Sequence, residues 1–239
     1  MYRFFTIAKH DELLRLIGSD AFHISNVLRL KVGDKVQLVT ADSHLLVCEL
    51  TKVQADGVIL NMLQTLEVLP ENSRLILAQG LAKGDKMDFI IQKAVELGVT
   101  DIVPLALKRC VVELDTPKAA KRVERWQKIA HEAAKQSKHS QVPVVHAVSS
   151  LSDFLANNIC KLCMLAYEEE RTLGLKEFLR TQELTQDTAL LIGPEGGFDA
   201  AEVRQAVDKG FVSVSLGKQI LRTETAPLML LSVLMYERS

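Results

Sequence analysis

Two glycine-bearing turns near the C-terminus combine residue types that suit ligand binding. The first is GPEGGF at positions 193–198, which follows the apolar run 189–192, and the second is LGKQILRTET at positions 216–225. Gly196 and Gly197 permit a positive φ and let a ligand approach the backbone closely. Both turns offer main-chain groups rather than a cluster of titratable side chains. They therefore predict a pocket for a cofactor that carries its own reactive group.

Each turn is predicted to join a buried strand to the start of a helix. If the two strands were adjacent and parallel, both turns would lie at the carboxyl edge of a sheet, where open α/β sheets bind ligands. Asp199 and Glu202 have the spacing of a capping box at the start of the helix that follows the first turn. An ordinary strand-to-helix turn remains the alternative, because this segment matches neither the dinucleotide fingerprint nor a Walker A loop.

Arg222 is the side chain of the second turn that helix capping does not explain. Thr223 or Thr225 can cap the last helix, and Glu224 complements the positive end of that helix. A cation such as Arg222 is unfavourable at the same end. We therefore take Arg222 as a functional candidate, with a surface salt bridge as the alternative.

Alternating strands and helices follow residue 74. The predicted strands are 75–79, 102–107, 142–146, 161–166, 189–192 and 212–216, and the predicted helices are 85–97, 117–137, 150–157, 199–209 and 223–236. This alternation is typical of an α/β domain, with a mainly parallel sheet and helices on both faces. The last predicted helix carries hydrophobic side chains around nearly its whole circumference. This pattern predicts that it is buried in the core or at a dimer interface.

The first 70 residues have a different pattern, which is mostly β. Their predicted strands are 2–6, 36–39, 45–53 and 58–63, and one helix is predicted at 20–30. Short strands separated by turn residues indicate a small β-barrel with a helical insert. Residues 69–73 read as a linker. We therefore predict one domain at 1–70 and a second at 74–239.

Composition narrows the function classes. Hydrophobic residues make up 48% of the 239 residues, so wholesale disorder is not expected. The net charge of −1 gives no global attraction to nucleic acid. Four scattered cysteines and the absence of a targeting pattern indicate a reducing cytoplasm. The apolar segment 226–235 is about half the ~20 residues of a membrane span, so no membrane partner is expected.

A series of motifs in this chain resembles the RsmE-type branch of the SPOUT RNA methyltransferases. The matching segments are GPEGGF (193–198), LG-x-x-ILR-x-ETA (216–226), KGDKMD (83–88) with QK (92–93) and ELGV (96–99), RW (125–126), EAA and QS (132–134 and 136–137), Pro143, and His23 with VLR (27–29). Their order is the family's order, and they span nearly the whole chain. Together they are far more specific than any single motif.

The resemblance implies a fold, an activity and a cofactor. It implies a PUA-like RNA-binding β-barrel at the N-terminus and a SPOUT α/β domain with a parallel sheet and a C-terminal trefoil knot. It further implies a homodimer that methylates N3 of a uridine in 16S rRNA of the small ribosomal subunit with S-adenosyl-L-methionine. By motif matching, the cofactor would lie among Leu165, Ala166, Ile192, Gly193, Glu195, Gly196, Leu216, Gly217, Ile220, Leu221, Arg222 and Ala226.

The resemblance also suggests roles in catalysis and RNA binding. The nitrogen N3 must lose its proton to attack a methyl group, so orientation and charge stabilisation should matter most. Arg222 would stabilise the developing uridine anion or position an RNA phosphate, and Glu195 and Glu224 are either proton acceptors or helix-end partners. The RNA-contact candidates are Arg3, His23, Arg29, Lys83, Lys86 and Arg109. Lys138-His139, Gln219 and Arg109-Cys110 depart from the family pattern and affect these contacts most.

Other features have ordinary explanations. Cys160 and Cys163 have CxxC spacing but lie on an apolar strand without a second pair, so buried thiols are favoured over a metal or redox site. Glu168-Glu169-Glu170 reads as a solvated loop. The basic helix at 118–138 is either a solvated face or a phosphate-facing surface. A non-catalytic RNA-binding ribosome-assembly factor remains the alternative function, and a nucleotide-binding oxidoreductase is disfavoured by the missing dinucleotide fingerprint.

Overall fold

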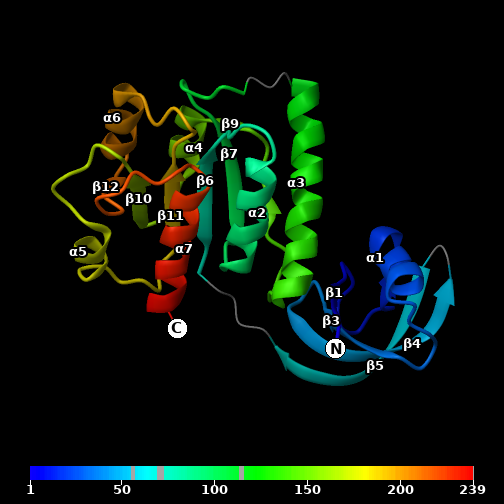
Figure 1. Ribbon diagram of the computed structural model, residues 1–239. Helices are drawn as coiled ribbons and strands as arrows, with labels where there is room; N and C mark the ends of the chain where they lie inside the picture. The colour runs from blue at the N-terminus through cyan, green and yellow to red at the C-terminus, as the bar shows by residue number, and fades with distance from the viewer. Residues whose placement is uncertain (55–56, 69–72, 113–115, 239) are drawn as a thin grey trace. The chain divides into compact units, whose positions relative to one another are not determined.

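The chain forms two compact units in the computed structural model, which describes residues 1–54, 57–68, 73–112 and 116–238 (Figure 1). The first unit comprises residues 1–72 together with 135–142. The second comprises residues 73–134 and 143–239. Most of the predicted linker, 69–72, lies outside the described residues.

The first unit is built on a five-stranded sheet in the order β1-β3-β4-β5-β2. Its elements are β1 (Arg3–Phe5), β2 (Arg15–Leu16), α1 (Gly18–Phe22), the π-helix η1 (His23–Val27), β3 (Lys35–Val39), β4 (His44–Gln54) and β5 (Gly57–Val68). The four predicted strands are present, whereas the two-residue β2 is too short to leave a sequence pattern. The predicted helix at 20–30 is instead one α-helical turn continued by a π-helical one.

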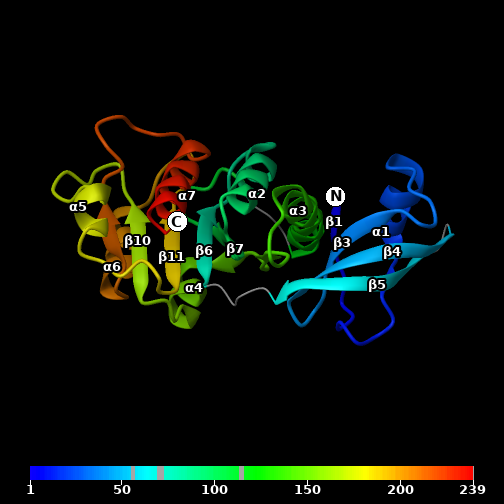
Figure 2. The ribbon, with the colours of Figure 1, turned by 90° about the horizontal axis from the view of Figure 1, so that it is seen from below.

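The second unit contains a parallel sheet in the order β12-β10-β11-β6-β7-β8, with β9 paired to β7. Its strands are β6 (Leu75–Gly80), β7 (Asp101–Ala106), β8 (Val144–Val145), β9 (Ser149–Ser150), β10 (Leu162–Ala166), β11 (Thr188–Ile192) and β12 (Val212–Val214). Its helices are α2 (Lys86–Glu96), α3 (Thr116–Ser137), α4 (Leu151–Asn157), α5 (Leu175–Leu179), α6 (Ala200–Asp208) and α7 (Thr225–Glu237). Figure 2 shows α2 and α7 on one face of the sheet and α4 and α6 on the other. The predicted α/β class is confirmed.

Helices on both faces explain why the central strands are apolar along their whole length. All residues of β6 and β11 are buried. On the α4 and α6 face, Phe154 and Phe211 pack with their ring centroids 6.0 Å apart, inside a cluster of buried side chains. The predicted capping box of α6 is confirmed, since Asp199 accepts from the helix backbone and Glu202 accepts from Asp199 N–H.

A buried carboxylate network stabilises the amino-terminal edge of this sheet. The Asp101 side chain is 11% exposed, and its oxygens lie 2.9 Å from Arg74 Nη2 and 2.7 Å from His146 Nε2. Thr100 Oγ1 donates a third hydrogen bond at 2.8 Å. Burial opposes ionisation of this carboxyl, but the hydrogen bonds from His146, Arg74 and Thr100 outweigh it and hold the pKa of Asp101 well below its usual range.

Replacing Asp101 with Asn should destabilise the protein in a pH-dependent way. A lowered folded-state pKa contributes stability above the carboxyl's unfolded pKa of about 3.9, and this contribution is lost as the pH falls through the folded value. Asp101→Asn should therefore lower the free energy of unfolding by about 2 kcal/mol at pH 7, with a smaller deficit at pH 3. Urea denaturation at both pH values measures this. Asp208→Asn, at an exposed position, is the control, and an equal deficit at both pH values would contradict the prediction.

Candidate functional site

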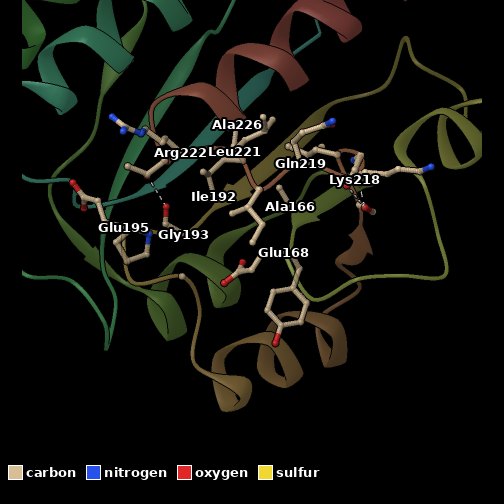
Figure 3. A pocket seen from close by; sticks show the side chains of 18 of the residues that line it. Ala166, Glu168, Ile192, Gly193, Glu195, Lys218, Gln219, Leu221, Arg222 and Ala226 are labelled. Atoms are coloured by element: carbon tan, nitrogen blue, oxygen red, sulfur yellow. Dashed lines mark hydrogen bonds between the residues drawn. The ribbon is translucent and has the colours of Figure 1, made fainter.

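Three loops at the carboxyl ends of β10, β11 and β12 enclose a cavity of about 370 Å³. They contribute residues 166–168 and 171, residues 192–195 and 197, and residues 215–223 respectively, and Lys86 and Ala226 complete the lining (Figure 3). The two glycine-bearing turns follow parallel strands that are not adjacent, because β10 lies between β11 and β12. The loop after β10 consequently forms a wall of its own. The second turn is also a long loop rather than a tight turn, since ten residues, 215–224, lie between the end of β12 and the start of α7.

Most of the residues expected to hold the cofactor line this one cavity. They are Ala166, Ile192, Gly193, Glu195, Leu216, Gly217, Ile220, Leu221, Arg222 and Ala226. Leu165 and Gly196 do not line it. Leu165 is fully buried in the sheet core. A Cβ on Gly196 would lie 2.9 Å from both Cβ and O of Arg109, so this glycine allows two segments to pack closely and does not face the cavity.

Buried hydrogen bonds join the second loop to the first. Thr223 Oγ1 donates to Gly193 O at 2.7 Å and accepts from Gln79 Nε2 at 3.0 Å. The expectation that Thr223 or Thr225 caps the last helix is therefore wrong: the N-cap is Glu224, which makes no side-chain capping bond. Thr223 is used instead to fix the cavity wall, because its hydroxyl bridges β6 and both loops.

Thr223→Val should separate the two loops. It removes a hydroxyl and leaves the partly buried carbonyl of Gly193 without this donor, at a cost of about 1–3 kcal/mol. We expect a lower thermal unfolding temperature and a cofactor affinity weaker by about tenfold, measured by calorimetric titration. Thr223→Ser keeps the hydroxyl and should behave like the wild type. Wild-type affinity in the Val variant would show that these bonds do not shape the cavity.

Lys86 links the two candidate catalytic carboxylates. Its Nζ lies 3.1 Å from Glu195 Oε1 and 3.3 Å from Glu224 Oε2, and Lys83 N–H donates to Glu195 Oε1 at 3.0 Å. The hydrogen bond with Glu195 raises the pKa of Lys86, so this ammonium stays charged. Burial of Glu195 acts against its ionisation, but the bonds from Lys83 N–H and Lys86 prevail and lower its pKa. Both carboxylates thus neutralise a lysine that was expected to contact RNA.

Arg222 stands at the rim of the cavity with its side chain 83% exposed. Its Nη1 lies 4.0 Å from Glu224 Oε1, which is a weak surface contact. The backbone carbonyl of Arg222 accepts from Thr225 N–H and Ala226 N–H, so the start of α7 fixes its position. Figure 3 shows Arg222 and Glu195 on one side of the cavity and Lys218 and Gln219 on the other. The guanidinium is therefore a solvent-exposed cation beside the cavity.

The remaining RNA-contact candidates differ in their exposure and in the contacts that they make within the protein. In the first unit, Arg3 Nη1 donates to Lys138 O at 2.5 Å and to His139 O at 3.2 Å, while Arg29 is exposed with a φ of 53°. The ring of His23 is half-buried and packs edge-on against Phe4. In the second unit, Lys83 and Arg109 are exposed, and Arg109 Nη1 donates to Gly196 O at 3.3 Å. Arg29, Lys83 and Arg109 thus expose their charges most freely.

Several residues that line the cavity were not among the residues expected to hold the cofactor. They are Tyr167, Glu168, Arg171, Pro194, Gly197, Ser215, Lys218, Gln219 and Thr223. The first three directly follow β10, and no glycine lies among residues 167–173, so only the position after a strand signalled them. Of the CxxC pair, Cys163 is buried and Cys160 is half-buried, both as free thiols, and burial raises the pKa of each. The expectation of buried thiols is confirmed for Cys163 and only partly met by Cys160.

Comparisons with known proteins give two family matches. A family described as an RNA methyltransferase domain matches residues 70–235, and one described as an RNA methyltransferase PUA domain matches residues 16–63. The ribosomal RNA small subunit methyltransferase E of Bacillus subtilis is 40% identical over 231 residues, with 93% of this chain and 89% of that protein covered. The protein of the same name from Mesomycoplasma hyopneumoniae is 32% identical, with 97% and 98% covered.

Two solved structures are similar to this chain over the whole fold. The ribosomal RNA small subunit methyltransferase E of Neisseria gonorrhoeae bound to S-adenosyl methionine matches with a TM-score of 0.87 at 32% identity, covering 99% of this chain and 98% of that chain. A putative methyltransferase of Legionella pneumophila in complex with SAM gives a TM-score of 0.88 at 32% identity, covering 99% and 97%. These likenesses agree with the expected SPOUT domain and PUA-like domain.

The volume and the lining of the cavity are suitable for S-adenosylmethionine. Its volume of about 370 Å³ lies within the usual range of small-molecule sites, about 300–1,000 Å³. Apolar side chains such as Ile192, Leu221 and Ala226 line it beside backbone of two glycine-bearing loops.

Among the described residues, none of the helices has the length and hydropathy of a membrane span.

Proposed function

The chain belongs to the ribosomal RNA small subunit methyltransferase E family of S-adenosylmethionine-dependent rRNA methyltransferases, and from this premise we propose that it methylates N3 of a uridine in 16S rRNA. The observation that carries the proposal is the cavity of three loops with the exposed guanidinium of Arg222 at its rim. A donor enclosed by backbone and an acceptor outside the rim suit methyl transfer to a large substrate.

We infer that the cavity-lining residues hold the cofactor, which supplies an electrophilic methyl group when bound. The main chain at Gly193 and Gly217 would take its polar groups, and Ile192 and Leu221 would cover its apolar surface. The hydrogen bonds between Thr223, Gly193 and Gln79 keep the two loops together before binding. Such preorganisation reduces the entropy that binding would otherwise cost.

The carboxylates suit a positioning role better than a proton-accepting one. A lowered pKa makes Glu195 a weak base, and its oxygen already accepts from Lys83 N–H and Lys86. Glu224 faces the same ammonium. Arg222 is therefore the group that stabilises the negative charge developing on the uridine, since its guanidinium is always charged and is free to turn toward the substrate.

The second unit is proposed to act as a homodimer. The helix α7 leaves Met229, Met235 and Tyr236 exposed, and Phe89 of α2, which packs against α7, is exposed as well. Exposed apolar side chains on two helices that pack together favour an interaction surface. Light scattering should give twice the chain mass of 26.6 kDa, and a single-chain mass would contradict the dimer.

A methyl-transfer assay tests the proposed substrate. Purified protein would be incubated with methyl-labelled S-adenosylmethionine and either free 16S rRNA or small subunits from cells that lack this protein, and nucleosides would then be analysed by mass spectrometry. We expect labelled N3-methyluridine. Label on another base or position would contradict the proposed acceptor. RNA binding without any methyl incorporation would favour the non-catalytic assembly factor.

A further inference from the structure

The second glycine of the first turn, Gly197, leaves space for a carboxylate. Its φ is 69°, and a Cβ built on it would lie 2.2 Å from Glu168 Oε1 and 3.2 Å from Glu168 Cδ. Real atoms do not approach so closely, so any side chain at Gly197 would displace the Glu168 carboxylate. Both residues line the cavity, one from the loop after β11 and the other from the loop after β10.

Glu168 differs from the two carboxylates that follow it. Glu169 accepts from Tyr167 OH at 2.9 Å, and Glu170 accepts from Thr172 and Leu173 of its own loop. Glu168 has no hydrogen-bond or ion-pair partner within the part of the chain that the structure describes, and it is exposed toward the cavity. Figure 3 shows its side chain beside Ile192 and Ala166, below the level of Arg222. Glu168 is thus exposed in the loop that the sequence predicts to be solvated, and it also lines the cavity.

We propose that Glu168 accepts hydrogen bonds from the bound cofactor, and that Gly197 is glycine so that this carboxylate can occupy its place over the loop. An ionised carboxylate is an acceptor only and needs donors or positive charge. S-adenosylmethionine offers both through its ribose hydroxyls, its ammonium group and its sulfonium. The proposal rests on the cavity being the cofactor site and adds a side chain that the family motifs do not indicate.

The variant Glu168→Gln tests the proposal with binding as the readout. It keeps the size of the side chain and removes its charge. We expect calorimetric titration to show S-adenosylmethionine bound about 10- to 100-fold more weakly, as for the loss of a hydrogen bond to a charged group. Glu169→Gln is the matched control, since Glu169 lies one residue away and does not line the cavity. It should bind like the wild type.

Three ligands identify which cofactor group Glu168 contacts. A loss shared by S-adenosylmethionine, S-adenosylhomocysteine and methylthioadenosine places the contact on the ribose. A loss confined to the first two places it on the ammonium group, and a loss confined to S-adenosylmethionine places it on the sulfonium charge. Equal affinity of Glu168→Gln and wild type for all three ligands would overturn the proposal. Failure of the wild type itself to bind S-adenosylmethionine would instead overturn the assignment of the cavity.

A double-mutant cycle tests the placement of the carboxylate over Gly197. Gly197→Ala should weaken binding in the wild-type background through backbone strain and through displacement of Glu168. In a Glu168→Ala background only the strain remains, so the second loss should be several-fold smaller than the first. Equal losses in the two backgrounds would overturn the placement.

Discussion

Arg222→Ala should lower kcat by about 100- to 1,000-fold, the loss typical when one donor to a developing anion is removed. Its side chain is 83% exposed and lies 4.0 Å from Glu224 at its closest ion pair, so removal leaves no cavity and no buried unpaired group. The backbone bonds from Thr225 and Ala226 to its carbonyl are unaffected. Thermal unfolding and cofactor affinity should therefore stay close to those of the wild type.

The kinetic pattern separates two roles for Arg222. If it stabilises the uridine anion, kcat falls and the dependence of activity on salt is unchanged. If it binds an RNA phosphate, KM rises and the salt slope falls by about one. Arg222→Lys keeps the charge but not the planar fork, so it should recover part of the rate. Arg204→Ala, on the exposed side of α6, is the control, and near-normal turnover in Arg222→Ala would reject a catalytic role.

Local patterns predicted the elements of the second unit but not the neighbours of each strand. Apolar runs located β6, β10 and β11, because strands buried on both faces carry almost no polar residues. Strand order depends on long-range packing, which has no local signal. The insertion of β10 between β11 and β12 consequently hid the third wall of the cavity, including Glu168.

The sequence also placed several residues correctly at the site without indicating which contacts they make there. Lys86 was named as an RNA contact on the family resemblance, yet its ammonium pairs with Glu195 and Glu224. Thr223 was expected to cap the last helix because it lies next to the helix start, where the N-cap is in fact Glu224. Its actual partners, Gln79 and Gly193, are 144 and 30 residues away in sequence. Hydrogen bonds of such separation cannot be derived from spacing.

Gly196→Ala should weaken cofactor binding through contact between two loops, without filling the cavity. The new Cβ would lie 2.9 Å from Cβ and O of Arg109, and neither atom belongs to the flexible end of a side chain. The loop after β11 must therefore shift away from the segment after β7. Overpacking of this kind costs about 1–3 kcal/mol, or about 5- to 150-fold in an equilibrium constant. Gly196→Val should be at least as damaging.

Stability without ligand identifies the cause. A side chain that only filled the cavity would leave the unliganded protein as stable as the wild type, whereas contact with Arg109 must also lower its thermal unfolding temperature. Gly174→Ala is the control, because Gly174 has a φ of −80° and open space at its Cβ position. Arg109→Ala should not rescue Gly196→Ala, since Cβ and O remain. If binding were lost while the unfolding temperature stayed unchanged, Gly196 would have to line the cavity. That result would contradict the contact with Arg109.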